Sequence, residues 1–392
     1  SKDIKEVTSG IDVSKGKLDL CVMNQSGIVA QAEFINDLSG VKKVFELLIE
    51  NKCYDAAIES TGPYWYGVYD YLTEHGINVM LVNPAKAKSH LLNKSDRLDG
   101  ASLATLLMIN QLSPSFVPDK DLRKLKRLTR MRASLTEMKT AIKNQTTAVV
   151  STFSPELLSL FSDAFGKSGK ELLYKIANGE KITGLSEEKM KRLQEIISNA
   201  FQKLDPWIIQ FALSMISEIE EKVKELDDAI ASMIQSMPKI RKYVDLLLTI
   251  SGIGLETAQA IAAEIGDISR FSTSGKLVRY SGLNPTYKQS GSVKVYGKLE
   301  KAGPPYLRRM LYQAAQVMAF FGPDEFKNYY THLINRFGSK GYTVAIVSLA
   351  RKLLRVIWAM LTDESEFIDQ KTALAESKRR RIAKRAEKFN PG

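Results

Sequence analysis

The sequence predicts an α/β domain at the amino-terminal end, followed by a mainly helical remainder. From residue 1 to 118, short apolar runs separated by turn residues alternate with helical patterns, whereas the later patterns are helical. Charge divides at the same point: residues 1–118 hold 11 Lys and Arg against 14 Asp and Glu, and the remainder holds 45 against 30. With 392 residues, 44% of them hydrophobic, the chain is long enough for two or three domains with cores of their own.

The uneven charge predicts two kinds of partner. The net charge of +12 comes from the part beyond residue 118. A basic surface favours phosphate-rich polymers, whereas an acidic one favours cations. Two cysteines in apolar runs and three scattered histidines exclude a zinc finger and indicate buried thiols. No apolar run approaches the ~20 residues of a membrane span, and no signal peptide is recognisable. We therefore expect a cytoplasmic protein in a reducing compartment with no membrane partner.

Residues 1–118 are expected to form an RNase H-like layer of one sheet with covering helices. Three alternating runs indicate antiparallel strands, after which strand and helix patterns alternate. The predicted strands are 8–15, 18–23, 27–34, 54–60 and 77–82, and the predicted helices are 38–51, 64–75 and one that begins near Pro84. The sugar-kinase fold shares this opening, but the segment has no second Gly-rich phosphate loop and is too short for a duplicated fold.

Four acidic residues of this domain are candidates for one metal site. Asp12 and Glu59 end two predicted strands, and the three-residue spacing of Asp96 and Asp99 places both on one face of a predicted helix. Unpaired carboxylates ~4 Å apart repel by about 4 kcal/mol per pair at an effective dielectric of 20. A cluster at one sheet edge would therefore need a hard cation, Mg²⁺ or Mn²⁺. The alternative, that each acid is a turn residue or lies on a solvated face, stays open.

The segment 119–237 is expected to be a basic helical spacer. Leu122 opens a long helical pattern with an apolar stripe, and residues 119–150 carry nine cationic against three anionic side chains. This cationic face is either solvated or in contact with a nucleic-acid backbone. The nucleic-acid contacts predicted on it are Arg123, Lys124, Lys126, Arg127 and Arg130.

A second long helix is predicted over 205–236, where apolar residues repeat at a spacing close to 3.5. The stripe fits a hairpin with the 122–139 helix of the same chain and a coiled coil between two chains equally well. The segment 151–203 between the two helices contains no motif that indicates a role.

The segment 238–365 is expected to be a mainly helical domain. Residues 246–266 follow a helix-hairpin-helix pattern, in which the turn at Gly252 and Gly254 leaves backbone N–H groups open to a DNA phosphate or serves packing alone. A buried helix is predicted over 341–361. The final segment, 366–392, is a basic tail that we expect to add a further grip on nucleic acid.

A polar, glycine-flanked loop at 282–292 presents Ser290 ahead of a basic helix. Most loop serines are only solvated or form turns. A serine that attacks phosphorus, however, keeps the bond energy in a phosphoester, so that a second DNA end can be joined without ATP. Tyr287 and Ser292 are alternative nucleophiles. The nucleic-acid contacts predicted in this part of the chain are Gly252, Gly254, Lys288, Lys298, Arg308 and Arg309.

The motifs at 10–15, 59–65, 83–86 and 96–99 together resemble the amino-terminal domain of DEDD-type insertion-sequence transposases, relatives of the Piv DNA invertases. The carboxy-terminal run that contains Ser290 resembles the second catalytic domain of the same family. Two residues depart from the family pattern. Gly100 stands where alanine is more usual, which weakens a helix by about 1 kcal/mol, and Ser251 stands where proline is more usual.

The resemblance implies a RuvC-like first domain in which Asp12, Glu59, Asp96 and Asp99 bind Mg²⁺. It implies that Ser290 is the nucleophile of the second domain. It further implies an element-encoded bridge RNA that pairs with donor and target DNA. Finally, it implies a tetramer in which the acids of one subunit meet the serine of another.

We therefore expect a DNA transposase or recombinase that cuts and rejoins strands through a phosphoserine with help from Mg²⁺ or Mn²⁺. Its partners would be donor DNA, target DNA, a guide RNA and further copies of the chain, as a dimer or tetramer in a prokaryotic nucleoid. Two alternatives remain. One is a metal-dependent nuclease or junction resolvase in which Ser290 is structural, and the other is a non-catalytic DNA-architectural protein.

Overall fold

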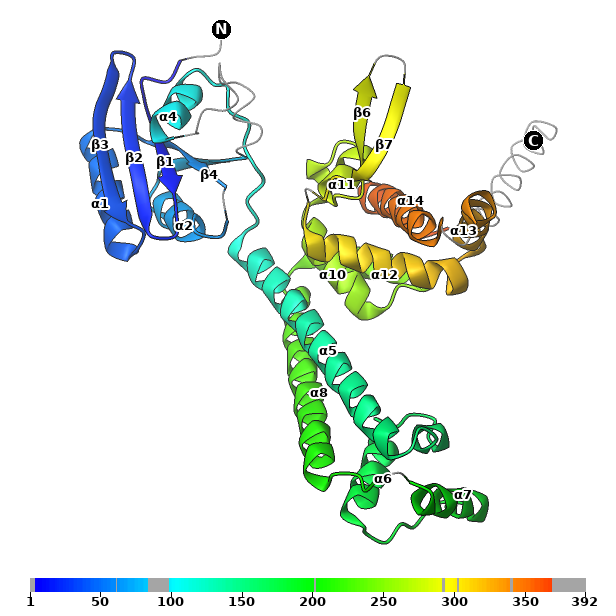
Figure 1. Cartoon of the computed structure of the whole chain (residues 1–392). Helices are drawn as coiled ribbons and strands as arrows, with labels where there is room; N and C mark the ends of the chain where they lie inside the picture. Colours follow the sequence, from blue (N-terminus) through cyan, green and yellow to red (C-terminus); the bar gives the residue numbers. More distant parts are fainter. Residues whose placement is uncertain are drawn as a thin grey trace, which may run out of the picture. The chain divides into compact units, whose positions relative to one another are not determined.

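The computed structural model describes residues 4–60, 62–83, 99–200, 202–290, 293–301, 303–338 and 341–368, and side chains are described for these except at 286–298. The chain divides into two compact units, Ser1–Val117 and Pro118–Gly392 (Figure 1). The finer division of the second unit into spacer, helical domain and tail remains a prediction. None of the described helices is long and apolar enough to cross a membrane.

The first unit is built on a five-stranded mixed sheet in the order β3-β2-β1-β4-β5. The strands are β1 (Val7–Val13), β2 (Lys17–Asn24), β3 (Gly27–Ile35), β4 (Asp55–Glu59) and β5 (Asn78–Val82). The first three form an antiparallel meander, and β4 and β5 run parallel to β1. This confirms the five predicted strands, the antiparallel meander of the first three and the alternation of strands with helices that follows it. Short apolar runs bounded by turn residues made these strands predictable.

Helices cover both faces of the sheet. The face that contains the buried Ile11 and Ile58 packs against α1 (Leu38–Glu50) and α2 (Tyr66–Glu74). On the opposite face, Ala57 packs against α4 (Gly100–Met108). The hydroxyl of Thr8 donates to the Ala104 carbonyl oxygen at 2.8 Å, which ties β1 to α4. The helix predicted near Pro84 lies outside the described residues.

The second unit begins with a helical hairpin. The helices α5 (Lys120–Phe153) and α8 (Pro206–Gln235) lie side by side (Figure 1) and are bridged by the ion pair of Arg132 with Asp227, at 2.6 Å. Both predicted long helices are confirmed, and their stripes meet within the chain. The coiled coil between chains stays a prediction. Asp119 and Asp205 cap the two helices by accepting from backbone N–H groups.

Residues 154–205 form a small helical module at the far end of this hairpin. It consists of the short helix η2 (Leu157–Leu160), α6 (Lys167–Asn178) and α7 (Glu187–Ser198). These elements share a core with the ends of α5 and α8. The buried members of this core include Val150, Phe153, Leu157, Leu173, Leu193 and Ile209.

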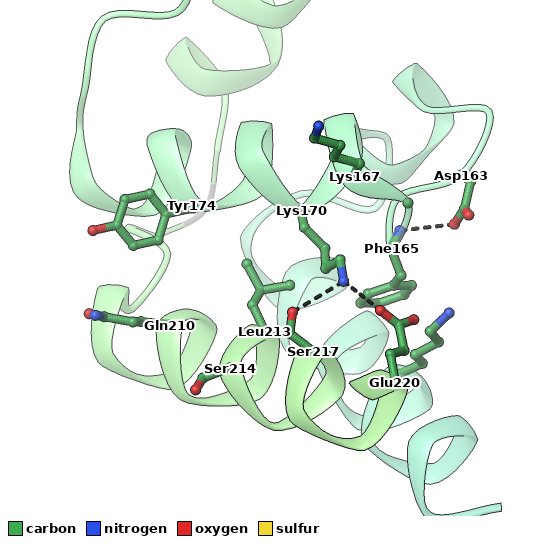
Figure 2. Close-up of a pocket in the computed structure, with 12 residues that line it drawn as sticks. Asp163, Phe165, Lys167, Lys170, Tyr174, Gln210, Leu213, Ser214, Ser217 and Glu220 are labelled. Carbon is green, nitrogen blue, oxygen red and sulfur yellow. Dashed lines mark hydrogen bonds and ion pairs between the residues drawn. The ribbon is translucent and has the colours of Figure 1, made fainter. Parts of the chain in front are cut away.

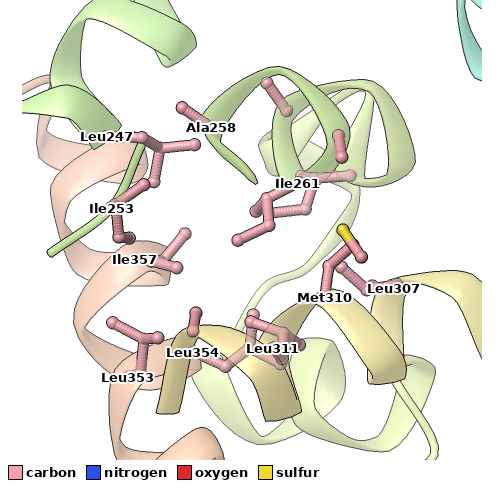
Figure 3. Packing of buried hydrophobic residues seen from close by; sticks show 14 of the residues in the cluster. Leu247, Ile253, Ala258, Ile261, Leu307, Met310, Leu311, Leu353, Leu354 and Ile357 are labelled. Carbon is pink, nitrogen blue, oxygen red and sulfur yellow. The ribbon is translucent and has the colours of Figure 1, made fainter. Parts of the chain in front are cut away.

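The rest of the unit is a helical core that carries one β-hairpin. Its helices are α9 (Pro238–Leu248), α10 (Leu255–Ile265), η3 (Ile268–Arg270), α11 (Ser274–Tyr280), α12 (Pro305–Phe321), α13 (Asp324–Phe337) and α14 (Tyr342–Asp363). Figure 3 shows Leu247, Ile261, Leu311 and Ile357 meeting at its centre. Leu122 and Leu125 of α5 belong to the same core. The predicted buried helix at 341–361 is confirmed by α14.

Candidate metal and nucleophile sites

Asp12 and Glu59 are neighbours at the carboxyl ends of two parallel strands. The register pairs Ile11 of β1 with Ile58 of β4, so the next residue on each strand lies across from the other, with the strands about 4.8 Å apart. Side chains alternate along a strand. Asp12 and Glu59 therefore lie on the α4 face, opposite to the buried Ile11 and Ile58, and both are partly exposed. Their predicted meeting at one sheet edge agrees with this register.

Asp99 lies on the same face, but not inside a helix. It is the N-cap of α4, with extended backbone angles of φ −99° and ψ 176°, and its Oδ1 accepts from the backbone N–H of Ser102 at 2.8 Å. The expectation that Asp99 lies within a helix is therefore wrong, because α4 begins one residue later. Asp96 lies outside the described residues.

Two glycines hold the start of α4 against the sheet. A Cβ on Gly10 would overlap the carbonyl oxygen of Gly100 and lie 2.7 Å from the backbone nitrogen of Ala104. A Cβ on Gly100 would lie 2.8 Å from the carbonyl oxygen of Gly10. Gly10 is two residues from Asp12, and Gly100 adjoins Asp99, so this contact brings the two acids to one region. The sequence had assigned Gly100 only a helix-propensity cost.

A further acid, Asp19, lies directly across from Asp12 in the β1–β2 register. The Nζ of Lys17 lies 3.3 Å from Asp19 and 2.6 Å from Glu33, so this lysine bridges the two carboxylates. The hydrogen bond from Lys17 lowers the pKa of Glu33. The hydrogen bonds that Lys17 donates to Glu33 and Asp19 raise its own pKa. Sequence reasoning missed the pairing of Asp19 with Asp12. The tight turn between the first two strands could have shown it, because a short hairpin fixes which residues face each other.

The donor chemistry at this edge suits a hard divalent cation. Carboxylate oxygens are the ligands that Mg²⁺ and Mn²⁺ prefer. Within the described residues, no three His, Cys, Asp or Glu side chains meet closely enough to form a metal cage, and Asp96 is not among those residues. Burial, with the nearby Asp99 charge, raises the pKa of the thiol of Cys21, which pairs with Gly10 in the sheet.

Ser290 ends a strand and does not lie in a loop. The second unit contains an antiparallel hairpin of β6 (Pro285–Ser290) and β7 (Val293–Leu299), in which Ser290 pairs with Val293. The predicted loop at 282–292 is therefore wrong over most of its length. Residues 285–290 are polar and do not indicate a strand by themselves. They form one because β7, which contains β-branched and aromatic residues, pairs with them. The side chains of Tyr287, Lys288, Ser290 and Lys298 are outside the described part, as is Ser292 altogether.

The predicted phosphate contacts Arg308 and Arg309 are both engaged within the chain. Nη1 of Arg308 donates to the carbonyl oxygens of Ser281 and Gly303, at 3.3 and 3.5 Å. Arg309 forms an ion pair with Glu137 of α5 and lies over the ring of Tyr306, 5.8 Å from its centroid. These contacts give both arginines a role in holding α12 to its neighbours.

The predicted basic face of α5 is only partly exposed. Arg130 makes a bidentate pair with the fully buried Glu264 of α10, at 2.7 and 3.0 Å. Arg123 is only 8% exposed. Burial lowers the pKa of Lys126 to about 8, although Glu264 opposes the shift. Arg123 is therefore buried and not part of an exposed cationic face, Lys126 is partly buried, and Arg130 stays half-exposed although it is paired. Lys124 and Arg127 remain exposed.

A short turn joins α9 to α10 at the place predicted for the helix-hairpin-helix, and that motif stays a prediction. Gly252 has φ +95°, and Gly254 is the N-cap of α10, with no side chain capping the helix. Both glycines are exposed. Glu256 in the first turn pairs with Arg132 of α5 at 3.2 Å. The open N–H groups suit a phosphate, and contact with DNA at this turn stays a prediction.

An open cavity of about 640 Å³ lies between α5, α6 and α8 in the segment to which the sequence assigned no role. Figure 2 shows Lys170 bonded to Glu220 and to the Ser217 hydroxyl, at 2.7 and 3.2 Å. Asp163 accepts from the backbone N–H of Phe165, close to the start of α6. The polar groups of this cavity thus satisfy one another to a large extent.

Two family models match the chain. Residues 9–155 match a transposase model, DEDD_Tnp_IS110, and residues 244–331 match the model described as transposase IS116/IS110/IS902 family. Over 373 residues the chain is 24% identical to the pilin gene-inverting protein of Moraxella bovis, covering 91% of this chain and 96% of that protein. Over 372 residues it is 26% identical to the transposase for insertion sequence element IS1111A of Coxiella burnetii, covering 93% and 92%.

Among solved structures, the chain is similar to the Thermus thermophilus RuvC in complex with a Holliday junction substrate. The sequence identity is 13%, the TM-score is 0.23, and the match covers 28% of this chain and 100% of that one.

Proposed function

The chain belongs to the IS110/IS116 family of DEDD transposases, and we propose that it cuts and rejoins DNA through a covalent bond to Ser290. A divalent metal held by Asp12, Glu59, Asp96 and Asp99 would assist this reaction. The observation that carries the proposal is the packing of Asp12, Glu59 and the α4 cap on one face of the sheet.

The serine step is a phosphoryl transfer in two halves. The Oγ of Ser290 attacks phosphorus, a P–Oγ bond forms, and the bridging bond to one deoxyribose oxygen breaks. The serine proton leaves to solvent, and the released deoxyribose oxygen takes up a proton. In the second half, a deoxyribose hydroxyl of another DNA end attacks the phosphoserine and restores the serine. No ATP is needed, because the phosphoester retains the energy of the broken bond.

The four acids would hold the cation, which when bound would neutralise the non-bridging phosphate oxygens. Asp12 and Glu59 present their carboxylates from rigid strand ends. Asp99 has one oxygen fixed by the Ser102 N–H, which orients its carboxylate. The Gly10–Gly100 contact keeps this cap at the sheet. Strand ends and a helix cap would thus fix the backbone positions of three of the four proposed ligands, which would lower the cost of assembling the site.

Nucleic acid and further copies of the chain are the proposed partners. Exposed Lys124 and Arg127 and the open turn at Gly252 and Gly254 would contact the backbones of donor and target DNA. A guide RNA, and a dimer or tetramer that joins acids and serine from different subunits, are proposed from the family resemblance. Purification with bound RNA of defined sequence would support the guide, and a monomer active without RNA would contradict both.

The variant Ser290→Ala separates this mechanism from a metal-dependent nuclease. With strand-transfer substrates and Mg²⁺, we expect the variant to lose both cleavage and rejoining. Full cleavage by the variant would instead support hydrolysis by the metal site alone, with a structural Ser290. The variant Asp12→Asn is the companion control, and its full activity would support a non-catalytic role of the acids.

A further inference from the structure

The hairpin that carries Ser290 is fastened at its base by two backbone segments that touch. Gly282, two residues after the end of α11, has φ +70°, a conformation that favours glycine. Its carbonyl oxygen accepts from the N–H of Lys301 at 3.3 Å, and the Asn284 carbonyl oxygen accepts from Glu300 at 2.9 Å. The segment that enters β6 and the segment that leaves β7 are thus joined below the strands.

No side chain fits between these segments. A Cβ on Gly303 would overlap the carbonyl oxygen of Tyr280 and would lie 3.0 Å from the nitrogen of Gly282. A Cβ on Gly282 would lie 3.0 Å from the nitrogen of Gly303 and 2.5 Å from Nη1 of Arg308. The base is therefore closed by backbone on backbone, with one guanidinium lying against it.

Arg308 connects this base to the rigid core. Its Nη1 reaches the carbonyl oxygens of Ser281 and Gly303, one on each side of the hairpin. Ser281 is fully buried, and its hydroxyl donates to Val278 at 2.7 Å. Arg308 itself stands in the first turns of α12, next to the fully buried Leu307. The side chain thus bridges a packed helix and both legs of the hairpin.

We infer that Arg308 is a positioning residue for Ser290 and not a ligand of the scissile phosphate. The inference rests on the proposed function of Ser290. Figure 1 shows β6 and β7 extending away from α11, and the six residues of β6 span about 17 Å. A tilt of about 5° at the base would move the tip by about 1.5 Å. Misplacement of a reacting group by about 1 Å can cost 10²-fold in rate.

The test compares Arg308→Ala with Arg309→Ala, its neighbour on α12 that faces α5. Hydrogen exchange is measured on the DNA-free protein, and kcat, KM and the DNA dissociation constant are measured at several salt concentrations. We expect Arg308→Ala to accelerate exchange of the β6 and β7 amides at least tenfold and to lower kcat 10- to 100-fold. KM and DNA affinity should stay within twofold. Arg309→Ala should leave exchange in the hairpin unchanged.

A phosphate ligand would behave differently. If Arg308 bound the phosphate, Arg308→Ala would weaken DNA binding and reduce the slope of log affinity against log salt by about one. Hydrogen exchange of the β6 and β7 amides would stay unchanged. That result would overturn the inference. Faster exchange with an unaltered kcat would overturn it as well. Gly282→Ala provides a second variant that removes no charge, and it should reproduce the loss of kcat with KM unchanged. Hydrogen exchange needs no DNA chemistry, so it tests the anchoring of the hairpin by Arg308 alone. The activity of Ser290→Ala tests the Ser290 mechanism, and the two proposals can therefore fail independently.

Discussion

The carbonyl oxygen of Gly100, the first residue of α4, occupies the place that a Cβ on Gly10 of β1 would need. This contact joins helix to sheet within two residues of Asp12 and one residue of Asp99. The acids therefore depend on a backbone contact that contains no functional group. Any side chain at position 10 must push α4 from the sheet and carry Asp99 away from Asp12.

The two glycines should respond unequally to alanine. Gly10→Ala overlaps backbone atoms, so we expect a loss of about 1–3 kcal/mol of stability, typical of overpacking, together with loss of Mn²⁺ binding. Gly100→Ala also meets backbone, because its Cβ would lie 2.8 Å from the Gly10 oxygen, but alanine improves helix propensity by about 1 kcal/mol. We expect that variant to lose less stability than Gly10→Ala. Urea unfolding and Mn²⁺ titration measure both effects, and equal damage from the two substitutions would contradict this account.

The Arg130–Glu264 pair should be a major contributor to stability. Glu264 is fully buried, so Arg130→Ala leaves a buried charge without its bidentate partner. Breaking a fully buried pair costs about 3–5 kcal/mol, and the half-exposed Arg130 side chain reduces that cost through solvent screening. We expect a loss below that range in chemical unfolding. The matched control is Lys124→Ala on the exposed side of α5, which should stay within about 0.5 kcal/mol. Similar values for the two variants would show that the pair is not needed to join α5 to α10.

Lys126 should make stability depend on pH in the alkaline range. Burial first, and then the charges of Arg270 and Arg130, lowers its pKa from 10.5 to about 8, against the opposing effect of Glu264. At pH values between these two pKa values, the Lys126 side chain keeps its proton in the unfolded chain but has lost it in the folded chain. The free energy of unfolding should therefore rise with pH, by up to about 1.4 kcal/mol per unit. Lys126→Met should abolish this rise, and parallel curves for variant and parent would contradict the prediction.

Lys124 should contact a nucleic-acid backbone. It is exposed on α5 beside residues that are turned inward. Lys124→Ala should weaken DNA binding about equally for all sequences and reduce the slope of log affinity against log salt by about 1. Lys222→Ala on α8 is the control, because Lys222 is exposed and paired with Glu225. An unchanged slope for Lys124→Ala would show that DNA does not contact this face of α5.

The five strands of the first unit, the long helices and the Asp12–Glu59 pair could be predicted because each follows from a local rule. Period-2 runs specify strands, and residues that follow paired positions of parallel strands lie side by side. The Gly10–Gly100 contact could not be predicted in this way. It depends on how closely α4 approaches the sheet, and two separate glycines give no sign in sequence that they meet.

The errors have a common physical origin in packing partners that sequence does not reveal. The apolar stripe of α5 indicates one buried side, but this helix packs against both α8 and α10. Arg123, Lys126 and Arg130 flank that stripe, and α10 supplies the buried Glu264 that pairs with the half-exposed Arg130. The loop predicted around Ser290 is a strand because β7 pairs with it. In each case a neighbour distant in sequence decides the environment.

Mass spectrometry of the protein after reaction with nicked DNA and Mg²⁺ tests the central claim most directly. The phosphoserine mechanism predicts a nucleotide adduct on the peptide that contains Ser290, absent when Asp12→Asn replaces the parent. Efficient strand cleavage with no adduct, or an adduct mapped to Tyr287 or Ser292, would contradict it.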